Sequence, residues 1–132
     1  MTVAIVAVGH VGIRVHDLDR ALAFYGQLGF TQVWWGEEDR VSVLRHPAGM
    51  EINLIVNAVA DGPNVLMDVP KKVAGITHVA WSVQSVDAAA AALLVSGHVI
   101  TEGPVTHGNG SRSVFVRDPD HNVVEFCQPA PS

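Results

Sequence analysis

The sequence predicts an α+β fold made of two tandem βαβββ modules. The chain of 132 residues repeats itself, and in each half the spacing of apolar residues changes from a strand period to a helix period and back. Turns rich in Gly, Pro, Asp and Asn separate the segments. We expect modules at residues 7–58 and 75–129, a linker at residues 59–74, and a single domain over residues 1–132, because a domain usually holds roughly 100 to 200 residues.

The clearest part of the repeat covers the start of each module. Residues 10–24 align with residues 78–92 at a constant offset of 68 residues, and His10 falls on His78. A single His in a strand is usually structural. Its recurrence at a matched position, inside segments that are otherwise apolar, favours a shared role instead.

A second alignment covers the end of each module at a slightly larger offset. It places residues 43–53 over residues 115–126 and matches Glu51 with Glu125. This match requires the turn before Glu125 to be two residues longer than the turn before Glu51. We therefore expect equivalent carboxylates on the last strand of each module.

Each module is predicted to begin with a strand and a helix. In residues 11–15, Val and Ile alternate with Gly and Arg, which is the period of a half-buried strand. Asp17 is a suitable N-cap for the helix that follows, and Gly29 suits the left-handed residue that ends it. Ser85 and Gly97 repeat this plan in the second module. Three shorter β-like runs complete each module, at residues 31–35, 40–45 and 50–56 and at residues 98–103, 113–117 and 123–128.

Four residues are candidates for one divalent-metal site. Side chains alternate between the two faces of a strand, so His10 and His78 lie on the face opposite the apolar side chains that pack on the helix. Glu51 and Glu125 are expected on that same face of the last strands. Two imidazoles and two carboxylates suit Ni²⁺, Zn²⁺, Mn²⁺, Co²⁺ or Fe²⁺, with substrate or water at the remaining positions. Ligand chemistry alone does not choose among these metals.

Composition excludes several partners and locations. The formal net charge is −5 and the eight Lys and Arg residues are scattered, so no basic stripe for nucleic acid is present. No apolar run approaches the roughly 20 residues that span a membrane, and the N-terminus lacks the pattern of a signal peptide. The single cysteine, Cys127, cannot form a disulfide within the chain. We expect a cytoplasmic protein with neither nucleic acid nor membrane as a partner.

Four segments resemble the vicinal oxygen chelate superfamily, which includes glyoxalase I, extradiol dioxygenases and bleomycin resistance proteins. They are GHVGIRVHDLDRALAFYGQLGF at residues 9–30, GMEINLI at 49–55, THVAWSV at 77–83 and VRDPDHNVVEF at 116–126. The resemblance implies a curved, cup-like mixed sheet that encloses one metal ion, with the helices on the outside. It also implies a small-molecule substrate and a homodimer with sites at the interface. In that dimer His10 and Glu51 of one chain would meet His78 and Glu125 of the other.

The predicted ligand set is most similar to that of bacterial glyoxalase I. By this resemblance the enzyme isomerises the hemithioacetal of a 2-oxoaldehyde and a thiol through an enediolate, and Glu125 or Glu51 moves the proton. Two alternatives remain open. An extradiol-type dioxygenase would hold Fe(II) with His10, His78 and Glu125, although Glu51 would then occupy a position that oxygen chemistry needs. An antibiotic resistance protein would transfer a thiol or bind a drug.

Three further residues are candidates for substrate contact. Arg14 lies four residues after His10 on the same strand face, roughly 13 Å away, where it could reach the carboxylate of a thiol cosubstrate or another anionic substrate. An ion pair with an acidic residue is the alternative role for Arg14. His107 and Arg112 lie in the Gly-rich run THGNGSR, which could act as a lid over the cavity.

Overall fold

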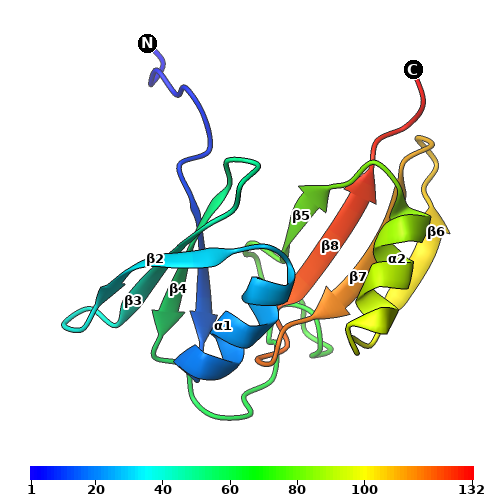
Figure 1. The fold of residues 1–132 in the computed structure, drawn as a ribbon. Helices are drawn as coiled ribbons and strands as arrows, with labels where there is room; N and C mark the ends of the chain where they lie inside the picture. The colour runs from blue at the N-terminus through cyan, green and yellow to red at the C-terminus, as the bar shows by residue number, and fades with distance from the viewer. The chain divides into compact units, whose positions relative to one another are not determined.

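The structure is a computed structural model that describes residues 1–132. The chain forms two compact units, Met1–Ala60 and Asp61–Ser132, which we call module 1 and module 2 (Figure 1). Each unit contains one helix and four strands in the order βαβββ, which confirms the predicted α+β fold with tandem modules. The prediction that both units act as one domain stays a prediction.

Module 1 is a four-stranded mixed sheet with a helix against one face. Its elements are β1 (Val11–Val15), α1 (Leu18–Gln27), β2 (Thr31–Gly36), β3 (Val41–Arg45) and β4 (Glu51–Val56). The strands lie in the order β1-β4-β3-β2, and β1 is parallel to β4 while the other pairs are antiparallel. Ile52, Leu54 and Val56 are buried on the helix side of β4, so Glu51 and Asn53 point to the other side. We call this other side the helix-free face of the sheet.

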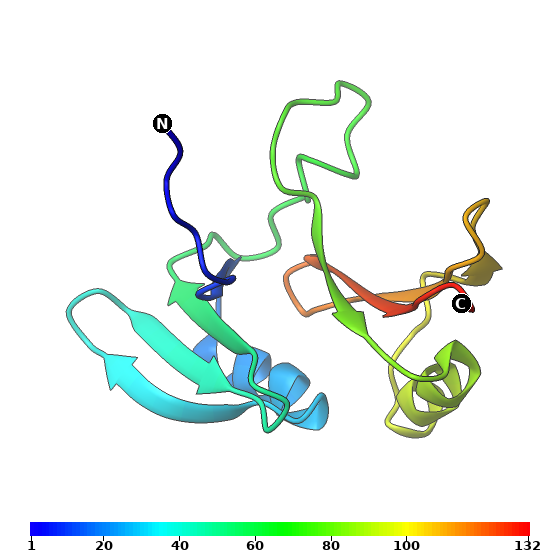
Figure 2. The same ribbon diagram turned by 90° about the horizontal axis from the view of Figure 1, so that it is seen from above.

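Module 2 repeats this topology. Its elements are β5 (His78–Ser82), α2 (Val86–Val95), β6 (Glu102–Thr106), β7 (Arg112–Arg117) and β8 (Val123–Gln128). The strand order is β5-β8-β7-β6, with β5 parallel to β8. In each module the helix lies against one face of its own sheet (Figure 2), so module 2 also has a helix-free face.

The helices begin and end where the sequence predicts. Asp17 and Ser85 are the N-caps of α1 and α2, and each side chain accepts a hydrogen bond from the backbone N–H three residues later. Gly29 and Gly97 follow the helices with φ angles of 101° and 85°, a conformation that glycine adopts without strain. Neither helix has the length and apolar composition that a membrane-spanning segment requires.

Aromatic side chains distinguish the core of module 1 from that of module 2. The ring centroid of the fully buried Tyr25 lies 4.9 Å from that of Phe24 and 6.3 Å from that of Phe30. The buried hydrophobic residues are Ile13, Val15, Ala21, Phe24, Tyr25, Phe30, Leu44, Ile52, Leu54 and Val56 in module 1, and Val86, Ala90, Leu93, Val114, Val116, Val123, Val124 and Phe126 in module 2. Phe126 is the one aromatic residue among the buried hydrophobic residues of module 2, so the large rings of the core lie mainly in module 1.

The register of the last two strands corrects the predicted alignment. Leu44 pairs with Ile52 in module 1, and Val116 pairs with Val124 in module 2. Both residues of the second pair follow their counterparts by 72 positions, so the two turns have the same length. The predicted two-residue extension of the second turn was therefore wrong.

The extra residues of module 2 lie earlier in the chain. Val11 on β1 pairs with Ile52, and Val79 on β5 pairs with Val124, so the first strands keep their offset of 68 positions. The offset is still 68 at Gly97, which ends α2 as Gly29 ends α1. Module 2 therefore gains its additional residues between Gly97 and β7, in the segment that forms β6 and the loop after it.

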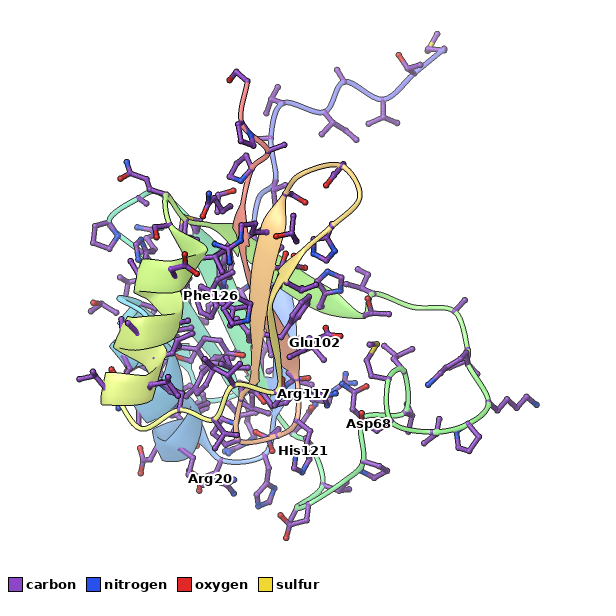
Figure 3. The ribbon with its side chains drawn as sticks, turned by 90° about the vertical axis from the view of Figure 1, so that its right-hand side faces the viewer. Arg20, Asp68, Glu102, Arg117, His121 and Phe126 are labelled. Atoms are coloured by element: carbon purple, nitrogen blue, oxygen red, sulfur yellow. The ribbon has the colours of Figure 1, made fainter.

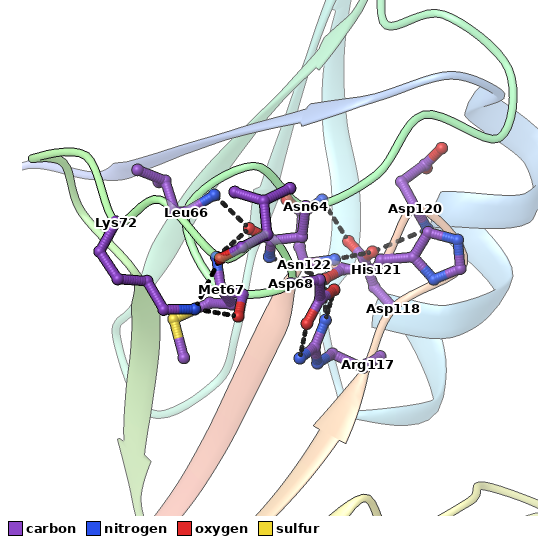
Figure 4. Close-up of polar contacts among 11 residues, drawn as sticks. Asn64, Leu66, Met67, Asp68, Lys72, Arg117, Asp118, Asp120, His121 and Asn122 are labelled. Carbon is purple, nitrogen blue, oxygen red and sulfur yellow. Dashed lines mark hydrogen bonds and ion pairs between the residues drawn. The ribbon is translucent and has the colours of Figure 1, made fainter.

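The segment between β4 and β5 is hydrogen-bonded to the β7–β8 hairpin of module 2. Arg117, at the end of β7, donates hydrogen bonds of 2.7 and 2.9 Å to the two carboxylate oxygens of Asp68 (Figure 3). Asn64 donates from Nδ2 to the carbonyl of His121 in the β7–β8 turn, and Lys72 donates to two carbonyls within the segment (Figure 4). The Arg117 hydrogen bond lowers the pKa of Asp68 from its ordinary value of 3.8. The predicted linker is thus tied to the end of β7.

Candidate functional site

His78 and Glu125 are two predicted metal ligands that are in contact in the structure. His78 is the first residue of β5, and Glu125 lies on the neighbouring strand β8. The His78 Nε2 atom lies 3.0 Å from Glu125 Oε1. The side chain of His78 is 39% exposed and that of Glu125 is 12% exposed, so the imidazole reaches solvent while the carboxylate is covered. An imidazole nitrogen and a carboxylate oxygen are therefore held together in module 2.

The other oxygen of Glu125 is held by Ser113 and, through it, by His107. Ser113 Oγ donates to Glu125 Oε2 at 2.6 Å, and Ser113 is fully buried. A hydroxyl has one proton, so Ser113 Oγ accepts from His107 Nε2, which lies 2.9 Å away. At the other end, Thr77 Oγ1 lies 2.8 Å from His78 Nδ1. A chain of polar contacts thus runs from the loop after β6 to the start of β5.

The His78–Glu125 pair suits a divalent metal ion in its chemistry. Glu125 is buried and pairs with no Lys or Arg, so its charge has only an imidazole and a hydroxyl beside it. Imidazole nitrogens and carboxylate oxygens are both common donors to such ions. The 3.0 Å between His78 Nε2 and Glu125 Oε1 is the distance of an ion pair, so a metal ion would bind these two atoms in place of their mutual contact.

The two predicted ligands in module 1 have different surroundings. His10 immediately precedes β1 and is exposed. Glu51 is the first residue of β4, and its Oε1 accepts a hydrogen bond of 3.0 Å from Arg45 Nε. The carboxylate of Glu51 is therefore already paired with a cation, unlike that of Glu125. The metal-binding role of Glu51 stays a prediction.

The observed register places Asn53, and not Glu51, at the position of Glu125. On the parallel ladders Asn53 pairs with Gly12 of β1 as Glu125 pairs with Ala80 of β5. The predicted equivalence of Glu51 and Glu125 was therefore wrong. The physical reason is that equal turn lengths leave no room for the two-residue shift that the equivalence requires.

The arginines predicted to contact substrate point to different faces. Arg14 is an exposed residue on the helix-free face of β1, and its Nε donates to Asn57 Oδ1 at 2.9 Å. Arg112 forms an ion pair of 3.0 Å with Asp87 of α2, which directs it to the helix side of β7. Arg14 remains a candidate contact for an anionic substrate. Arg112 is left out of the proposed site because Ser113, its neighbour, points the opposite way toward Glu125.

No three His, Cys, Asp or Glu side chains in residues 1–132 form a group that could hold a metal ion. Taken alone, module 2 supplies the His78–Glu125 pair. The full ligand set of His10, Glu51, His78 and Glu125 therefore stays a prediction.

Two polar residues of this region were missed from the sequence. Ser113 alternates with Phe115 in β7, and Phe115 pairs with Glu125, so strand parity would have placed Ser113 on the face of Glu125. Asn53 would have been found by keeping the offset of 72 residues that separates Pro47 from Pro119.

Comparison with known proteins agrees with the repeat and the topology. Residues 7–126, which cover most of both modules, match a family model described as Glyoxalase/Bleomycin resistance protein/Dioxygenase superfamily. The glyoxalase domain-containing protein RDO1 of Mycosarcoma maydis is 28% identical over 122 residues, or 89% of this chain. The chain spans 65% of the length of that relative.

Solved structures share the fold. The crystal structure of SMU.1112c matches with a TM-score of 0.77 and 26% identity, over 94% of this chain and 99% of that one. A glyoxalase/dioxygenase from Nostoc punctiforme matches with a TM-score of 0.71 and 21% identity, over 100% of both chains. The second likeness shows the fold alone, since few residues are identical.

Proposed function

Because the chain belongs to the Glyoxalase/Bleomycin resistance protein/Dioxygenase superfamily, we propose that it is a divalent-metal-dependent enzyme. Its substrate is a small molecule that binds through two adjacent oxygen atoms. The proposed ligands are His10, His78 and Glu125. Glu51, the fourth ligand predicted from the sequence, is paired with Arg45. A bound metal ion would stabilise negative charge that develops on a substrate oxygen.

The observation that carries this proposal is the buried carboxylate of Glu125. A charge in this environment is costly without a cation, and no Lys or Arg supplies one. Ser113 occupies Oε2 and so leaves Oε1 for a ligand. Thr77 contacts Nδ1 of His78, which fixes the ring with Nε2 toward Oε1. The side chains of module 2 thus hold the two proposed donor atoms next to each other.

The first candidate reaction is the glyoxalase I-type isomerisation of a 2-oxoaldehyde–thiol hemithioacetal. This reaction moves a proton between adjacent carbons, and a carboxylate near the metal must accept and return the proton. Glu125 and Glu51 are the candidates for this role. Glu51 would first have to leave Arg45, which holds it at 3.0 Å. Glu125 has one oxygen restrained by Ser113 and the other beside His78.

A second candidate, extradiol-type ring cleavage with Fe(II) and O₂, is favoured by the register of β4. Two His and one carboxylate leave positions open for a substrate and O₂. The objection to this reaction is a second carboxylate at the site. Asn53 stands at the position equivalent to Glu125, so the register gives no support to that second carboxylate. Thiol transfer or drug binding by an antibiotic resistance protein is the third alternative.

We also propose a homodimer in which ligands from module 1 of one chain and module 2 of its partner share a metal ion. Arg14 is the proposed contact for an anionic group of the substrate. Sedimentation of the metal-loaded protein tests the assembly: a species of twice the mass of the chain is expected, and a monomer that binds metal fully would contradict it.

Metal content tests the proposed function directly. The purified protein is loaded with Ni²⁺, Zn²⁺, Mn²⁺, Co²⁺ or Fe²⁺ in turn, dialysed and analysed for bound metal. One ion per pair of modules is expected, and no stoichiometric metal after loading with any of the five would refute the enzymatic proposal.

The variant Glu51→Gln distinguishes the isomerase reaction from the dioxygenase reaction. Loss of isomerase activity in this variant supports the glyoxalase I type, whereas undiminished O₂ uptake with a catechol supports the dioxygenase.

A further inference from the structure

We propose that Asn53 is the residue of β4 that faces the metal ion, with its Oδ1 atom as a neutral fourth donor beside His10, His78 and Glu125, and that Glu51 does not bind the metal. This inference rests on the proposed function. It begins with the ladders: Asn53 pairs with Gly12, and Glu125 pairs with Ala80. Both positions lie across from a residue with little or no side chain, so the two ladders place Asn53 and Glu125 alike.

The oxygen of Asn53 lacks a hydrogen-bond partner. Oδ1 is buried, yet no donor within the chain reaches it. A buried carbonyl oxygen without a donor costs free energy, so such an atom indicates that something outside the chain completes it. A metal ion accepts the lone pair of an amide oxygen as readily as a hydrogen-bond donor does, and amide oxygens are established ligands of hard cations.

The comparison with module 2 explains why this oxygen is unpartnered. The donor to Glu125 is Ser113, which pairs with Cys127 on the ladder. The corresponding residue of module 1 is Val41, which pairs with Ile55. Valine has no hydroxyl to give, so the Asn53 oxygen has no equivalent of the Ser113 contact.

Glu51 has a different role. It lies two residues before Asn53, at the start of β4, and its carboxylate accepts from Arg45, which is also its ladder partner on β3. Cross-strand pairs of opposite charge stabilise an antiparallel sheet locally. The Arg45 pair therefore accounts for Glu51 without a metal ion.

The substitution of an amide for a carboxylate sets the charge of the site. A divalent ion with two neutral imidazoles, one carboxylate and one amide keeps one positive charge, whereas a second carboxylate would cancel it. The remaining charge favours a substrate that chelates as a monoanion, with one negative charge shared by two adjacent oxygen atoms. Singly deprotonated catechols, hydroxamates and enolised 2-oxo compounds belong to this class.

Metal titration of the full chain tests the inference without an activity assay. Metal-depleted wild type, Asn53→Asp, Asn53→Ala and Glu51→Gln are titrated with Mn²⁺ and with Zn²⁺ by calorimetry. Asn53→Asp adds a charge with almost no change in shape and is expected to bind both metals about tenfold more tightly or better. Asn53→Ala is expected to bind them several-fold more weakly, and Glu51→Gln to stay within about twofold of wild type.

A second titration measures the charge of the site with acetohydroxamate, a chelator with two neighbouring oxygens and one negative charge when bound. The zinc-loaded Asn53→Asp variant is expected to bind it about tenfold more weakly than zinc-loaded wild type does. A large loss of metal affinity in Glu51→Gln, with Asn53→Asp and Asn53→Ala unchanged, would overturn the inference and leave the metal enzyme intact. Absence of metal binding in wild type would instead overturn the proposed function itself.

Discussion

Module 2 carries a buried carboxylate on its last strand, whereas module 1 carries a neutral amide at the equivalent position. Glu125 has Ser113 and His78 beside it, and Asn53 has no partner at its oxygen. The ladders that place these two residues are the same in both halves. The backbone repeat therefore fixes where a donor atom stands, while single side chains decide its charge and its partners.

The largest expected difference between the modules concerns metal affinity. In Glu125→Gln the amide oxygen still accepts from Ser113, but the negative charge is gone. Mutation of a residue that only contacts a metal ligand lowers metal affinity about 10- to 100-fold. Because Glu125 is itself a proposed ligand, we expect Glu125→Gln to lower the affinity for every metal that wild type binds by more than this. Calorimetric titration measures it, with circular dichroism as the control for folding. Wild-type affinity in this variant would remove Glu125 from the ligand set.

Ser113→Ala tests the residue that contacts the proposed ligand Glu125. It removes the donor to Glu125 Oε2 and the acceptor of His107, so we expect metal affinity to fall about 10- to 100-fold. Ser42→Ala is a matched control, since Ser42 is an equally buried serine of module 1 whose hydroxyl accepts from Gln32. We expect Ser42→Ala to lower the free energy of unfolding by about 1–3 kcal/mol and to leave metal affinity unchanged. Equal losses of affinity in both variants would show that only stability was measured.

The helix caps are expected to behave alike in the two modules. Asp17→Ala and Ser85→Ala each remove one side-chain acceptor at a helix start, at a cost of about 1 kcal/mol in the free energy of unfolding. The cost for Asp17 is larger by a few tenths of a kcal/mol, because its negative charge also interacts with the helix dipole. Urea denaturation of each variant measures both values. A larger loss of unfolding free energy in Ser85→Ala than in Asp17→Ala would contradict this prediction.

The smallest effect is expected at two equivalent arginines, Arg45 and Arg117. Arg117 pairs with Asp68 and lowers the pKa of that carboxyl below 3.8. A group whose pKa is lower in the folded state stabilises that state above its ordinary pKa, and the contribution disappears as the pH falls through the folded pKa. We therefore expect Asp68→Asn to lower the melting temperature slightly at about pH 7 and not at all below about pH 2.

The effect is small because the Asp68 side chain is 42% exposed, and exposed ion pairs contribute little. Glu51→Gln removes the ion pair at the equivalent arginine of module 1 and is the matched control. Melting curves of wild type and both variants, recorded across this pH range, measure the contributions. A difference between wild type and Asp68→Asn that grows toward low pH would contradict the sign of the linkage.

The fold was predictable because several local signals agree. The N-caps Asp17 and Ser85 and the left-handed Gly29 and Gly97 fix both helix ends, and all four depend on short-range chemistry that the sequence displays. Strand alternation gave the correct faces of β1 and β4 for the same reason. The repeat then supplied the topology twice.

The candidate site was less predictable, because register depends on pairing across the sheet. The identity of Glu51 and Glu125 suggested an alignment that the ladders do not allow. A two-residue shift keeps the side chain on the same face, so alternation could not reveal the mismatch. Strand parity places Ser113 on the face of Glu125, but its hydrogen bond to Glu125 joins two strands and depends on their register, which the spacing along the chain does not record.

The equal turns of the β3–β4 and β7–β8 hairpins bear on how the two halves diverged. If one ancestral unit was copied to give both, these hairpins now differ in their side chains and not in their length. Few substitutions are therefore needed to make the two hairpins alike at the candidate site. Asn53→Glu and Val41→Ser would give the first half the carboxylate and hydroxyl of the second, so the two hairpins can be made alike at these positions by point mutation alone.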